Sequence, residues 1–407
     1  MTANLTNWAG NITFGASAVH RPSTVDELRR VVAAAERLRP LGTAHSFNRL
    51  ADTSGELVSA AGLPPSVEID TGAAAVRVAA GMRYGELVAP LQAAGFALHN
   101  LGSLPHISVA GACATATHGS GERNGNLATA VAALDLVTAT GDLVEVDRST
   151  EGFAGMVVGL GALGVVVNLT LDLLPTFDIR QYVYQNLSHE ALFAHFDEIL
   201  GGGYSVSLFT GWHTPVFEQV WRKRLDEPEP GPWFGAAPAT APVHPVPGMP
   251  PANCTEQLGV PGVWHERLPH FRLAFTPSSG EELQSEFFVP REHALDAFTE
   301  IYRIRHLVSP VSQISEIRTI AGDDLWLSPC YGRDSVAFHF TWVKDAAAVL
   351  PVVEAIEDRL TAFGARPHWG KVFGLGGHYE RLADFQALTR KYDPAGKFRN
   401  ELLDRYL

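Results

Sequence analysis

Hydrophobic and polar positions in the first hundred residues predict short helices that alternate with strands. Apolar residues recur every three or four positions from 25 to 38, behind a capping Thr24, which predicts an amphipathic helix that ends near Pro40. Residues 66–78 alternate on either side of a Thr-Gly turn and predict a hairpin. Residues 84–94 predict a second helix, closed by a glycine. These small mixed units indicate an α+β fold.

Period-two alternation predicts strands further along the chain. Residues 133–146 form a second hairpin pattern, and residues 165–173 place an apolar side chain at every second position. After Pro175 the chain contains more aromatic residues, several strand-like runs and a helical stretch at 190–200. The change in pattern indicates that a second region begins there.

Three segments of this second region place polar side chains on one face of a sheet. Because alternate residues of a strand share a face, Glu316 and Arg318 project together, and so do His339 and Thr341. Gln284 lies on a third strand of this kind. The opposite face of the His339 strand is apolar, with Val336, Phe338, Phe340 and Trp342. A solvated face with one Glu–Arg ion pair and a pocket for a polar ligand both fit this pattern, since buried charges are costly unless paired.

Two segments lack a regular period. Residues 101–125 consist almost wholly of Gly, Ala, Ser and Thr with two histidines, so they have too few bulky side chains to form a core alone. Something else is expected to fill the space beside them. Residues 226–251 hold nine prolines and predict a long irregular loop.

Composition limits the class of protein. The chain has 407 residues, of which 46% are hydrophobic and 18% are charged, which is typical of a globular protein and suggests two domains. The formal net charge of −13 disfavours nucleic acid and anionic membranes as partners. Three widely spaced cysteines form no disulfide framework, and no secretory leader or membrane-length apolar run is visible, so we expect a cytoplasmic protein.

A dinucleotide-binding motif occurs in an unsuitable context. The stretch Gly159-Leu-Gly-Ala-Leu-Gly164 satisfies GxGxxG, but that motif needs a following helix whose N–H groups hold a pyrophosphate. A β-branched, alternating run follows instead, which disfavours a nicotinamide enzyme. Walker, serine-hydrolase and zinc-protease motifs do not occur, and we predict no metal site.

The candidate chemistry lies in the loop that follows the first predicted helix. Residues 41–48 read Leu-Gly-Thr-Ala-His-Ser-Phe-Asn and are rich in small and polar side chains. Successive backbone N–H groups in a tight turn can form a concave anion site, so a diphosphate can be held without Lys or Arg. Such a site suits an acidic protein.

This loop and residues 101–125, the small-residue tract, resemble the two flavin-binding tracts of the vanillyl-alcohol-oxidase type of FAD enzymes. The matching stretches of the second tract are Pro105–Gly111 and Thr115–Gly119. At the level of one subfamily, the chain closely resembles the bacterial alditol oxidases, also called xylitol or sorbitol oxidases. The segments that carry this resemblance are Asn7-Trp-Ala-Gly-Asn, Ser315-Glu-Ile-Arg-Thr and Pro367-His-Trp-Gly-Lys371.

The resemblance covers nearly the whole chain and implies a domain organisation. It implies an FAD-binding domain of the PCMH type over residues 1–175. An α+β substrate-binding cap domain, built on an antiparallel sheet, is expected over residues 176–365. Residues 366–407 are expected to return to the FAD domain and the active site.

The resemblance also implies covalent FAD, attached through the imidazole of His45, with His118 as the nearest rival for the bond. The family commonly has Gly where this chain has Ala44, which would be strained if the site needs a positive φ. Gly102 is expected to face the reactive edge of the flavin and to leave room for dioxygen. The other residues expected along the cofactor are Leu41, Gly42, Thr43, Ala44, Ser46, Ser103, Ser108, Gly111, Thr115, Ala116, Thr117, His118, Gly161, Gly164, Val165, His368 and Asn400.

By the same resemblance, the polar sheet face belongs to an alditol pocket. Lys371 and His339 are expected to orient and deprotonate the reacting hydroxyl, and Glu316 and Arg318 to clamp its neighbours. The implied reaction oxidises the terminal alcohol of an alditol such as xylitol or sorbitol to the aldose, and dioxygen is reduced to hydrogen peroxide. The full expected pocket is Ser103, Gln284, Glu316, Arg318, His339, Thr341 and Lys371.

Two other functions stay open at this point. A sugar-1,4-lactone oxidase or dehydrogenase of the gulonolactone type would share the fold, and a carbohydrate-binding protein could retain the flavin loop as a vestige. We expect an alditol and dioxygen as partners, neither nucleic acid nor a membrane, and a monomer.

Overall fold

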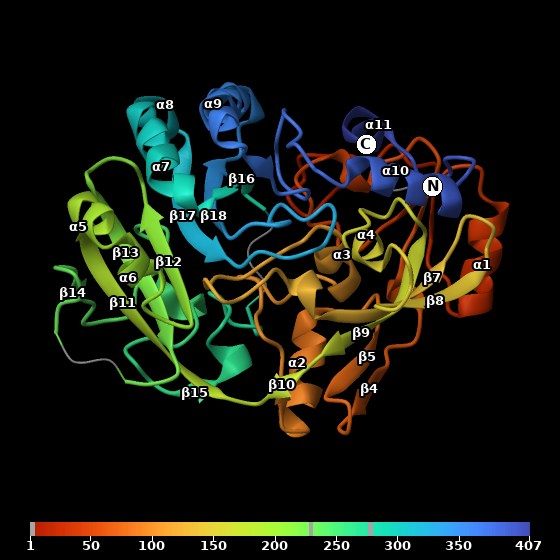
Figure 1. Cartoon of the computed structure of the whole chain (residues 1–407), viewed down its shortest axis with the longest axis horizontal. Coiled ribbons are helices and arrows are strands. Elements are labelled where there is room, and N and C mark those ends of the chain that lie inside the picture. The colour runs from red at the N-terminus through yellow and green to blue at the C-terminus, as the bar shows by residue number, and fades with distance from the viewer. Residues whose placement is uncertain (1–4, 228–230, 276–279) are drawn as a thin grey trace.

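The computed structural model describes residues 5–227, 231–275 and 280–407, and within them the strands form four sheets (Figure 1). Residues 1–4 of the expected first domain and 228–230 of the expected proline-rich loop lie outside the described residues. The elements before Asp178 and those after it occupy opposite halves of the molecule, and the C-terminal helices return to the first half (Figure 1).

The first half contains three small sheets. A parallel sheet has the order β1–β3–β2, from Ala18–His20, Glu56–Val58 and Leu38–Pro40. An antiparallel sheet has the order β4–β5–β9–β7–β8, from Val67–Asp70, Ala75–Ala79, Val165–Asp172, Val131–Val137 and Leu143–Asp147. Strands β6 (Phe96–Ala97) and β10 (Leu174–Pro175) pair with each other. The helices are α1 (Val25–Ala34), α2 (Tyr84–Ala93), α3 (Val109–Ala114) and α4 (Phe153–Val157).

Helix α1 is shorter than the hydrophobic spacing predicted. Its start is confirmed, because the side chain of Thr24 accepts a hydrogen bond from the backbone N–H of Glu27. The helix ends at Ala34 rather than near Pro40, and Leu38 belongs to β2, where it pairs with Glu56 of β3. A buried residue of a short strand fits the helical spacing by chance, so periodicity alone does not separate the two.

The other predicted elements of this half are confirmed. Strands β4 and β5 form the first hairpin and β7 and β8 the second, while α2 is followed by Gly95 at a φ of +82°. Strand β9 begins directly after Gly164. The GxGxxG motif is therefore followed by a strand, as expected, and not by the helix that a dinucleotide site requires.

The second half is built on one nine-stranded antiparallel sheet. The strand order is β14–β11–β13–β12–β17–β18–β16–β19, and β15 also pairs with β11. In that order the strands span Ala237–Pro238, Asp178–Ser188, Val216–Arg224, Ser205–Thr210, Ser312–Ile320, Ser335–Val343, Glu282–Pro290 and Arg366–Pro367, with β15 at Gly262–Val263. The three strands that were expected to carry the polar residues, β16, β18 and β17, are adjacent.

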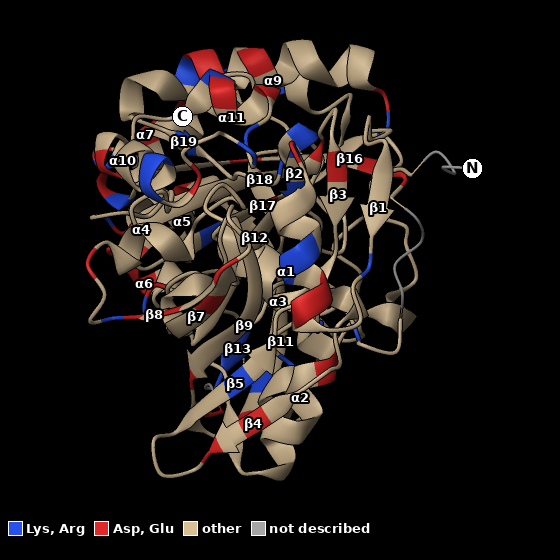
Figure 2. Ribbon diagram, turned by 90° about the vertical axis from the view of Figure 1, so that its right-hand side faces the viewer, with Lys and Arg blue, Asp and Glu red and all other residues tan. Residues whose placement is uncertain are grey.

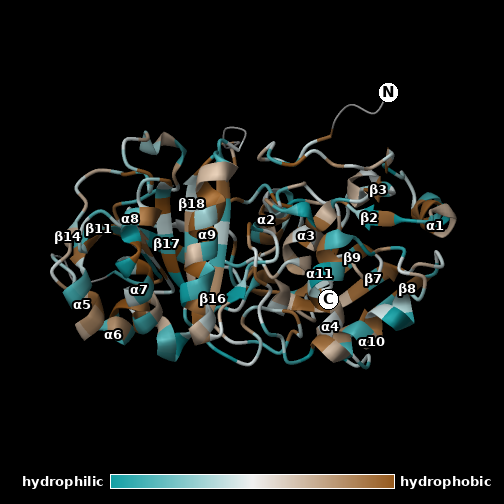
Figure 3. Ribbon diagram, turned by 90° about the horizontal axis from the view of Figure 1, so that it is seen from above, coloured by the Kyte–Doolittle hydropathy of each residue, from teal (hydrophilic) through white to brown (hydrophobic). Residues whose placement is uncertain are grey.

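Helices cover one face of this sheet (Figures 1 and 3). They are α5 (His189–Ala194), α6 (Phe196–Leu200), α7 (Ala294–Arg303), α8 (Arg305–Val308) and α9 (Ala346–Leu360). Their apolar side chains share a core with Phe338, Phe340 and Trp342 of β18. The predicted helical stretch at 190–200 is two helices, because the backbone leaves helical geometry at His195. The opposite face of β18 is thus left for polar side chains.

The last two helices, α10 (Leu382–Tyr392) and α11 (Glu401–Tyr406), pack on the first half. Phe385 and Leu403 share its core with Leu87 of α2. Acidic and basic residues are interspersed over the outer elements, α1 and α9 among them (Figure 2). Within the residues that the structure describes, none of the helices is both long enough and apolar enough to cross a bilayer.

Candidate active site

A cavity of about 560 Å³ is lined by segments from both halves of the molecule. Its walls are the loop 41–48, the small-residue tract, the glycine motif, the polar face of β16–β18 and the segment 368–371. It brings together most of the residues that the sequence singled out. These are Leu41, Gly42, Thr43, Ala44, His45, Ser46, Gly102, Ser103, Ser108, Gly111, Thr115, Thr117, His118, Gly161, Gly164, Val165, Gln284, Glu316, Arg318, His339, His368 and Lys371.

Three expected site residues do not line this cavity. Ala116 is buried behind it at a φ of +52°. Thr341 lies beside it, with its Oγ1 3.2 Å from Nε2 of His339. Asn400 caps α11, and its Nδ2 donates to the backbone carbonyls of residues 49, 50 and 52 at 2.8–3.0 Å. The structure therefore gives these three residues a supporting position rather than a place on the wall.

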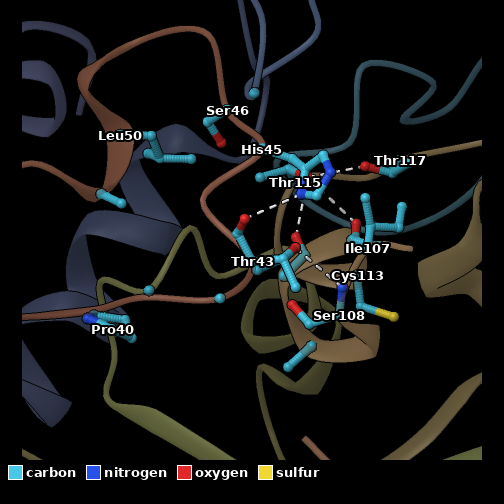
Figure 4. A pocket seen from close by; sticks show the side chains of 18 of the residues that line it. Pro40, Thr43, His45, Ser46, Leu50, Ile107, Ser108, Cys113, Thr115 and Thr117 are labelled. Atoms are coloured by element: carbon cyan, nitrogen blue, oxygen red, sulfur yellow. Dashed lines mark hydrogen bonds between the residues drawn. The ribbon is translucent and has the colours of Figure 1, made fainter. Parts of the chain in front are cut away.

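His45 lines the cavity on the same loop as Thr43 (Figure 4). Its Nδ1 lies 3.1 Å from the carbonyl of Thr43, and its ring stacks on Trp8 with centroids 5.2 Å apart. Burial lowers the pKa of His45 to about 4, so the imidazole is neutral at pH 7. A neutral imidazole has one unprotonated nitrogen, which a covalent bond to carbon requires.

His118 occupies a different environment from that of His45. Its Nδ1 lies 2.8 Å from the carbonyl of Gly119, and its Nε2 lies 3.2 Å from Oε1 of Glu286. Nδ1 is thus bound to the backbone, and Nε2 faces the buried carboxylate of Glu286 without forming a hydrogen bond among the described residues. This arrangement favours His45 over His118 as the candidate for a covalent bond.

The loop and the small-residue tract form a cradle that fits a diphosphate. A methyl group added to Gly42 or to Gly111 would lie 2.7 Å from Oγ of Ser108, so only glycine leaves this space open. Among the described residues, Ser108 Oγ is buried and has no hydrogen-bond partner. An unpartnered buried hydroxyl between two glycines is what a phosphate oxygen would satisfy.

The carboxylates of the described cavity wall lie on the large sheet and not near the loop. Arg39 and Arg83 are among the residues that line it near the loop. The carboxylates on its described wall, Glu286 and Glu316, belong to the large sheet. A dianionic group is thus accommodated near the loop, away from the acidic residues.

Arg39 ties several of the lining segments together, and sequence reasoning missed it. Its guanidinium donates to the carbonyls of Gly161, Leu160, Leu50 and Phe398 at 2.6–2.9 Å. Burial lowers its pKa to about 9. A lone Arg before a predicted loop gives no sequence signal for this role.

Glu286 is the second residue that sequence reasoning missed. It is fully buried, with Oε2 2.6 Å from Lys371 Nζ and Oε1 2.6 Å from Nη2 of Arg318. Burial alone would raise the pKa of Glu286, but Lys371, His118 and Arg318 hold it well below its usual range. The signal was available, because Glu286 lies two residues after Gln284 on the same strand and so shares its face.

The pair of Lys371 and His339 stands next to this carboxylate. Lys371 Nζ lies 2.8 Å from Nδ1 of His339, and Glu286 and His339 are opposite each other in the β16–β18 register. Burial lowers the pKa of Lys371 and holds that of His339 well below 6.5. A neutral His339 accepts at Nδ1 from the ammonium and directs its Nε2–H towards Thr341.

The segment that carries Lys371 is attached to both halves. Asn48 Nδ2 donates to the carbonyls of Trp369 and Lys371 at 2.8 and 2.7 Å, and the N–H of Phe47 donates to Gly370 at 2.7 Å. On the other side, the N–H of Val372 donates to Gln284 of β16 at 2.8 Å. These bonds fix Lys371 relative to both the loop 41–48 and the sheet.

Ala44 supplies a prediction about strain in the loop. Its φ is +57°, a conformation that costs an alanine about 1 kcal/mol relative to glycine. We expect Ala44→Gly to raise the free energy of unfolding by about 0.5–1 kcal/mol in urea titrations. The control Ala33→Gly, at an exposed position in the last turn of α1, should lower it, by up to a similar amount. Equal losses in both variants would show that Ala44 is not strained.

Comparison with known proteins shows which families the chain resembles. Residues 16–147 match the family described as an FAD binding domain, and residues 280–406 match D-arabinono-1,4-lactone oxidase. The chain is 54% identical over 411 residues to the alditol oxidase of Streptomyces sp. strain IKD472, covering 99% of both chains. It is 28% identical to the L-gulono-1,4-lactone dehydrogenase of Mycobacterium tuberculosis, over 98% of both.

Solved structures share the fold. A solvent-stable cholesterol oxidase superposes with a TM-score of 0.79 at 16% identity, over 98% of this chain and 96% of that one. The cholesterol oxidase of B. sterolicum gives 0.77 at 17% identity, over 99% and 96%. These findings confirm the expected α+β, vanillyl-alcohol-oxidase type of FAD-binding fold. Because the identity to the Streptomyces protein extends over essentially the full length of both chains, this protein belongs to the alditol oxidase family.

Proposed function

We propose that the protein is an FAD-dependent alditol oxidase. It oxidises the terminal primary alcohol of an alditol such as xylitol or sorbitol to the aldose, with dioxygen reduced to hydrogen peroxide. The observation that carries the proposal is the Lys371–His339 pair, 2.8 Å apart, in the same cavity as the glycine-lined loop of His45. When bound, FAD supplies the hydride acceptor for this oxidation.

The residues proposed to hold FAD are those around the loop. The backbone of residues 41–46 and Ser108 would bind the diphosphate, and the neutral imidazole of His45 would form the covalent bond to the flavin. The unpartnered Oγ of Ser108 and the low pKa of His45, about 4, support these roles. Gly159, Gly161 and Gly164 of the GxGxxG motif line the cavity and would allow close approach of the cofactor.

Lys371 and His339 would handle the proton of the reacting hydroxyl. In the resting arrangement Lys371 Nζ is directed at both Glu286 and His339. When Lys371 has lost a proton and is a neutral amine, a substrate hydroxyl that binds beside it can release its proton to Nζ as the carbon loses hydride. Burial lowers the pKa of Lys371, which brings the amine closer to the range in which it can accept a proton.

The neighbouring hydroxyls of the alditol would bind to Glu316 and Arg318. Both side chains are buried and line the cavity, and Arg318 Nη1 lies 3.6 Å from Oε2 of Glu316. A chain with a hydroxyl on every carbon can donate to the carboxylate and accept from the guanidinium at once. A simple alkyl alcohol would leave these groups desolvated and unpaired, which is unfavourable.

A lactone oxidase is the second candidate. It is favoured by the match of residues 280–406 to D-arabinono-1,4-lactone oxidase, while the lactone-oxidising relative is only 28% identical. The same fold and the same flavin loop would serve that reaction. The substrate test below separates the two.

We also propose a cytoplasmic location and a boundary between two domains. The three cysteines are free and buried, which fits a reducing cytoplasm.

Strands up to β10 share no sheet with later strands in the described residues, which supports a domain boundary at residue 175. β19 still pairs with β16, so the segment 366–407 begins at the edge of the cap sheet. The monomeric state stays a prediction.

Substitution of Lys371 tests the proposed chemistry. In stopped-flow reduction without oxygen, we expect xylitol to bleach the flavin of the wild-type protein, with L-gulono-1,4-lactone ineffective. Lys371→Met should slow reduction by xylitol about 10²- to 10⁴-fold, the usual contribution of a positioned acid or base, while the flavin stays bound. Lys391→Met, on the surface helix α10, is the matched control and should react normally. An unchanged rate in Lys371→Met, or reduction by the lactone alone, would contradict the proposal.

Gly102 tests the proposed access of dioxygen. A methyl group at this position would meet its nearest atoms, on Thr117, Ile107 and His118, at 3.7–3.9 Å, so Gly102→Ala fits without strain. The larger Gly102→Val should fill the adjacent space and slow reoxidation of the reduced flavin by about tenfold or more, with reduction by xylitol little changed. Oxygen-jump kinetics would measure both steps. Equal slowing of the two, or the same loss in Gly102→Ala, would refute the role.

A further inference from the structure

The polar network of the sheet extends beyond the cavity wall. Glu316 Oε1 lies 2.8 Å from His270 Nε2, and His270 Nδ1 lies 3.4 Å from Nζ of Lys223. All three side chains are buried, but of the three only Glu316 lines the cavity. His270 and Lys223 therefore stand behind a residue that faces the substrate.

The hydrogen-bonding capacity of these groups fixes the direction of each bond. A carboxylate only accepts, so His270 donates from Nε2 and a neutral ring then accepts at Nδ1. Lys223 donates to this nitrogen, to the carbonyl of Leu268 and to the carbonyl of Pro269 at 3.3 Å. Burial lowers the pKa of His270, in agreement with a neutral ring.

The imidazole of His270 is held rigidly. Phe209 and Trp221 meet it edge-on, with ring centroids 5.6 and 5.1 Å away. The backbone beside it is also fixed, because the N–H of Phe271 donates to the carbonyl of Ser103, a cavity residue, at 3.3 Å. A rigid donor can orient the carboxylate that it binds.

Glu316 is held differently at its two oxygens. Oε1 is bound by His270 from behind, while the other oxygen, Oε2, lies 3.6 Å from Arg318 Nη1, beyond hydrogen-bond distance. Burial alone would raise the pKa of Glu316, but Arg318 and His270 hold it well below its usual range. The carboxylate thus remains charged, and none of the described residues donates a hydrogen bond to Oε2, which leaves this oxygen for a substrate hydroxyl.

We infer that His270 and Lys223 are positioning residues for Glu316, and that they set the affinity for the alditol hydroxyls beyond the reacting carbon. Lys223 orients His270, and His270 orients the carboxylate. The inference rests on the proposed function. It means that two residues outside the cavity, His270 and Lys223, help to determine which substrates the enzyme binds. Among the described residues, the side chains of His270 and Lys223 hydrogen-bond to Glu316, to each other and to backbone carbonyls, and to neither Lys371 nor His339, so they should affect binding more than the rate of reduction.

The test is anaerobic reduction of the flavin by xylitol in His270→Phe, which keeps a ring but removes the donor. The xylitol concentration for half-maximal rate should rise about 10- to 100-fold, as expected for the loss of one hydrogen bond to a buried charge. The limiting rate should stay within about threefold of wild type. His270→Gln, which retains an N–H donor, should recover most of the affinity.

Lys223→Met is the second variant and covers the case in which His270→Phe does not fold. It should also raise the half-maximal concentration, by less than His270→Phe, with the limiting rate retained. Unchanged half-maximal concentrations in both variants, or a loss that His270→Gln shares fully, would overturn the inference. If the inference is overturned but xylitol still reduces the wild-type flavin, the proposed function survives. If xylitol does not reduce the wild-type flavin, the proposed function and the inference both fail.

Discussion

The hydrogen bonds between Asn48 and the segment 369–371 determine where the candidate chemistry can occur. The side-chain amide of Asn48 donates to the carbonyls of Trp369 and Lys371, and Phe47 donates to Gly370. The same loop carries His45, and the same segment carries Lys371. A contact between residues more than 300 positions apart in the chain therefore places the proposed flavin attachment and the proposed proton acceptor on one cavity. Neither the first half of the molecule nor the large sheet carries both His45 and Lys371.

The two ends of that cavity bind by different physical means. Near the loop, glycines and backbone amides leave an open cradle with Arg39 and Arg83 on the same wall and no carboxylate among its described residues, which suits a diphosphate. At the sheet, buried charges of both signs are paired, with Glu286 between Lys371 and Arg318. Pairing limits the cost of burying these ions. The polar groups of Glu316 and Arg318 can then form hydrogen bonds with a substrate that has many hydroxyls.

Much of this arrangement follows from sequence pattern, and the exceptions have physical reasons. Alternation along β17 predicted that Glu316 and Arg318 share a face, and both line the cavity. The same alternation along β16 would also have found Glu286, two residues after Gln284. Helical spacing predicted a helix longer than α1, because it counted Leu38, which is buried in strand β2 instead. His270 and Arg39 gave no signal, since one lies in an irregular segment and the other acts through carbonyls that only the fold brings together.

The claim on which the account depends is that FAD is bonded to His45. Intact-protein mass spectrometry of the denatured, purified chain, followed by mapping of the flavin-labelled peptide, tests it most directly. The account predicts a mass increase of one FAD, located on the peptide that contains His45 and absent from His45→Ala. An unmodified wild-type mass in a protein that was yellow before denaturation, or a label on His118, would contradict it.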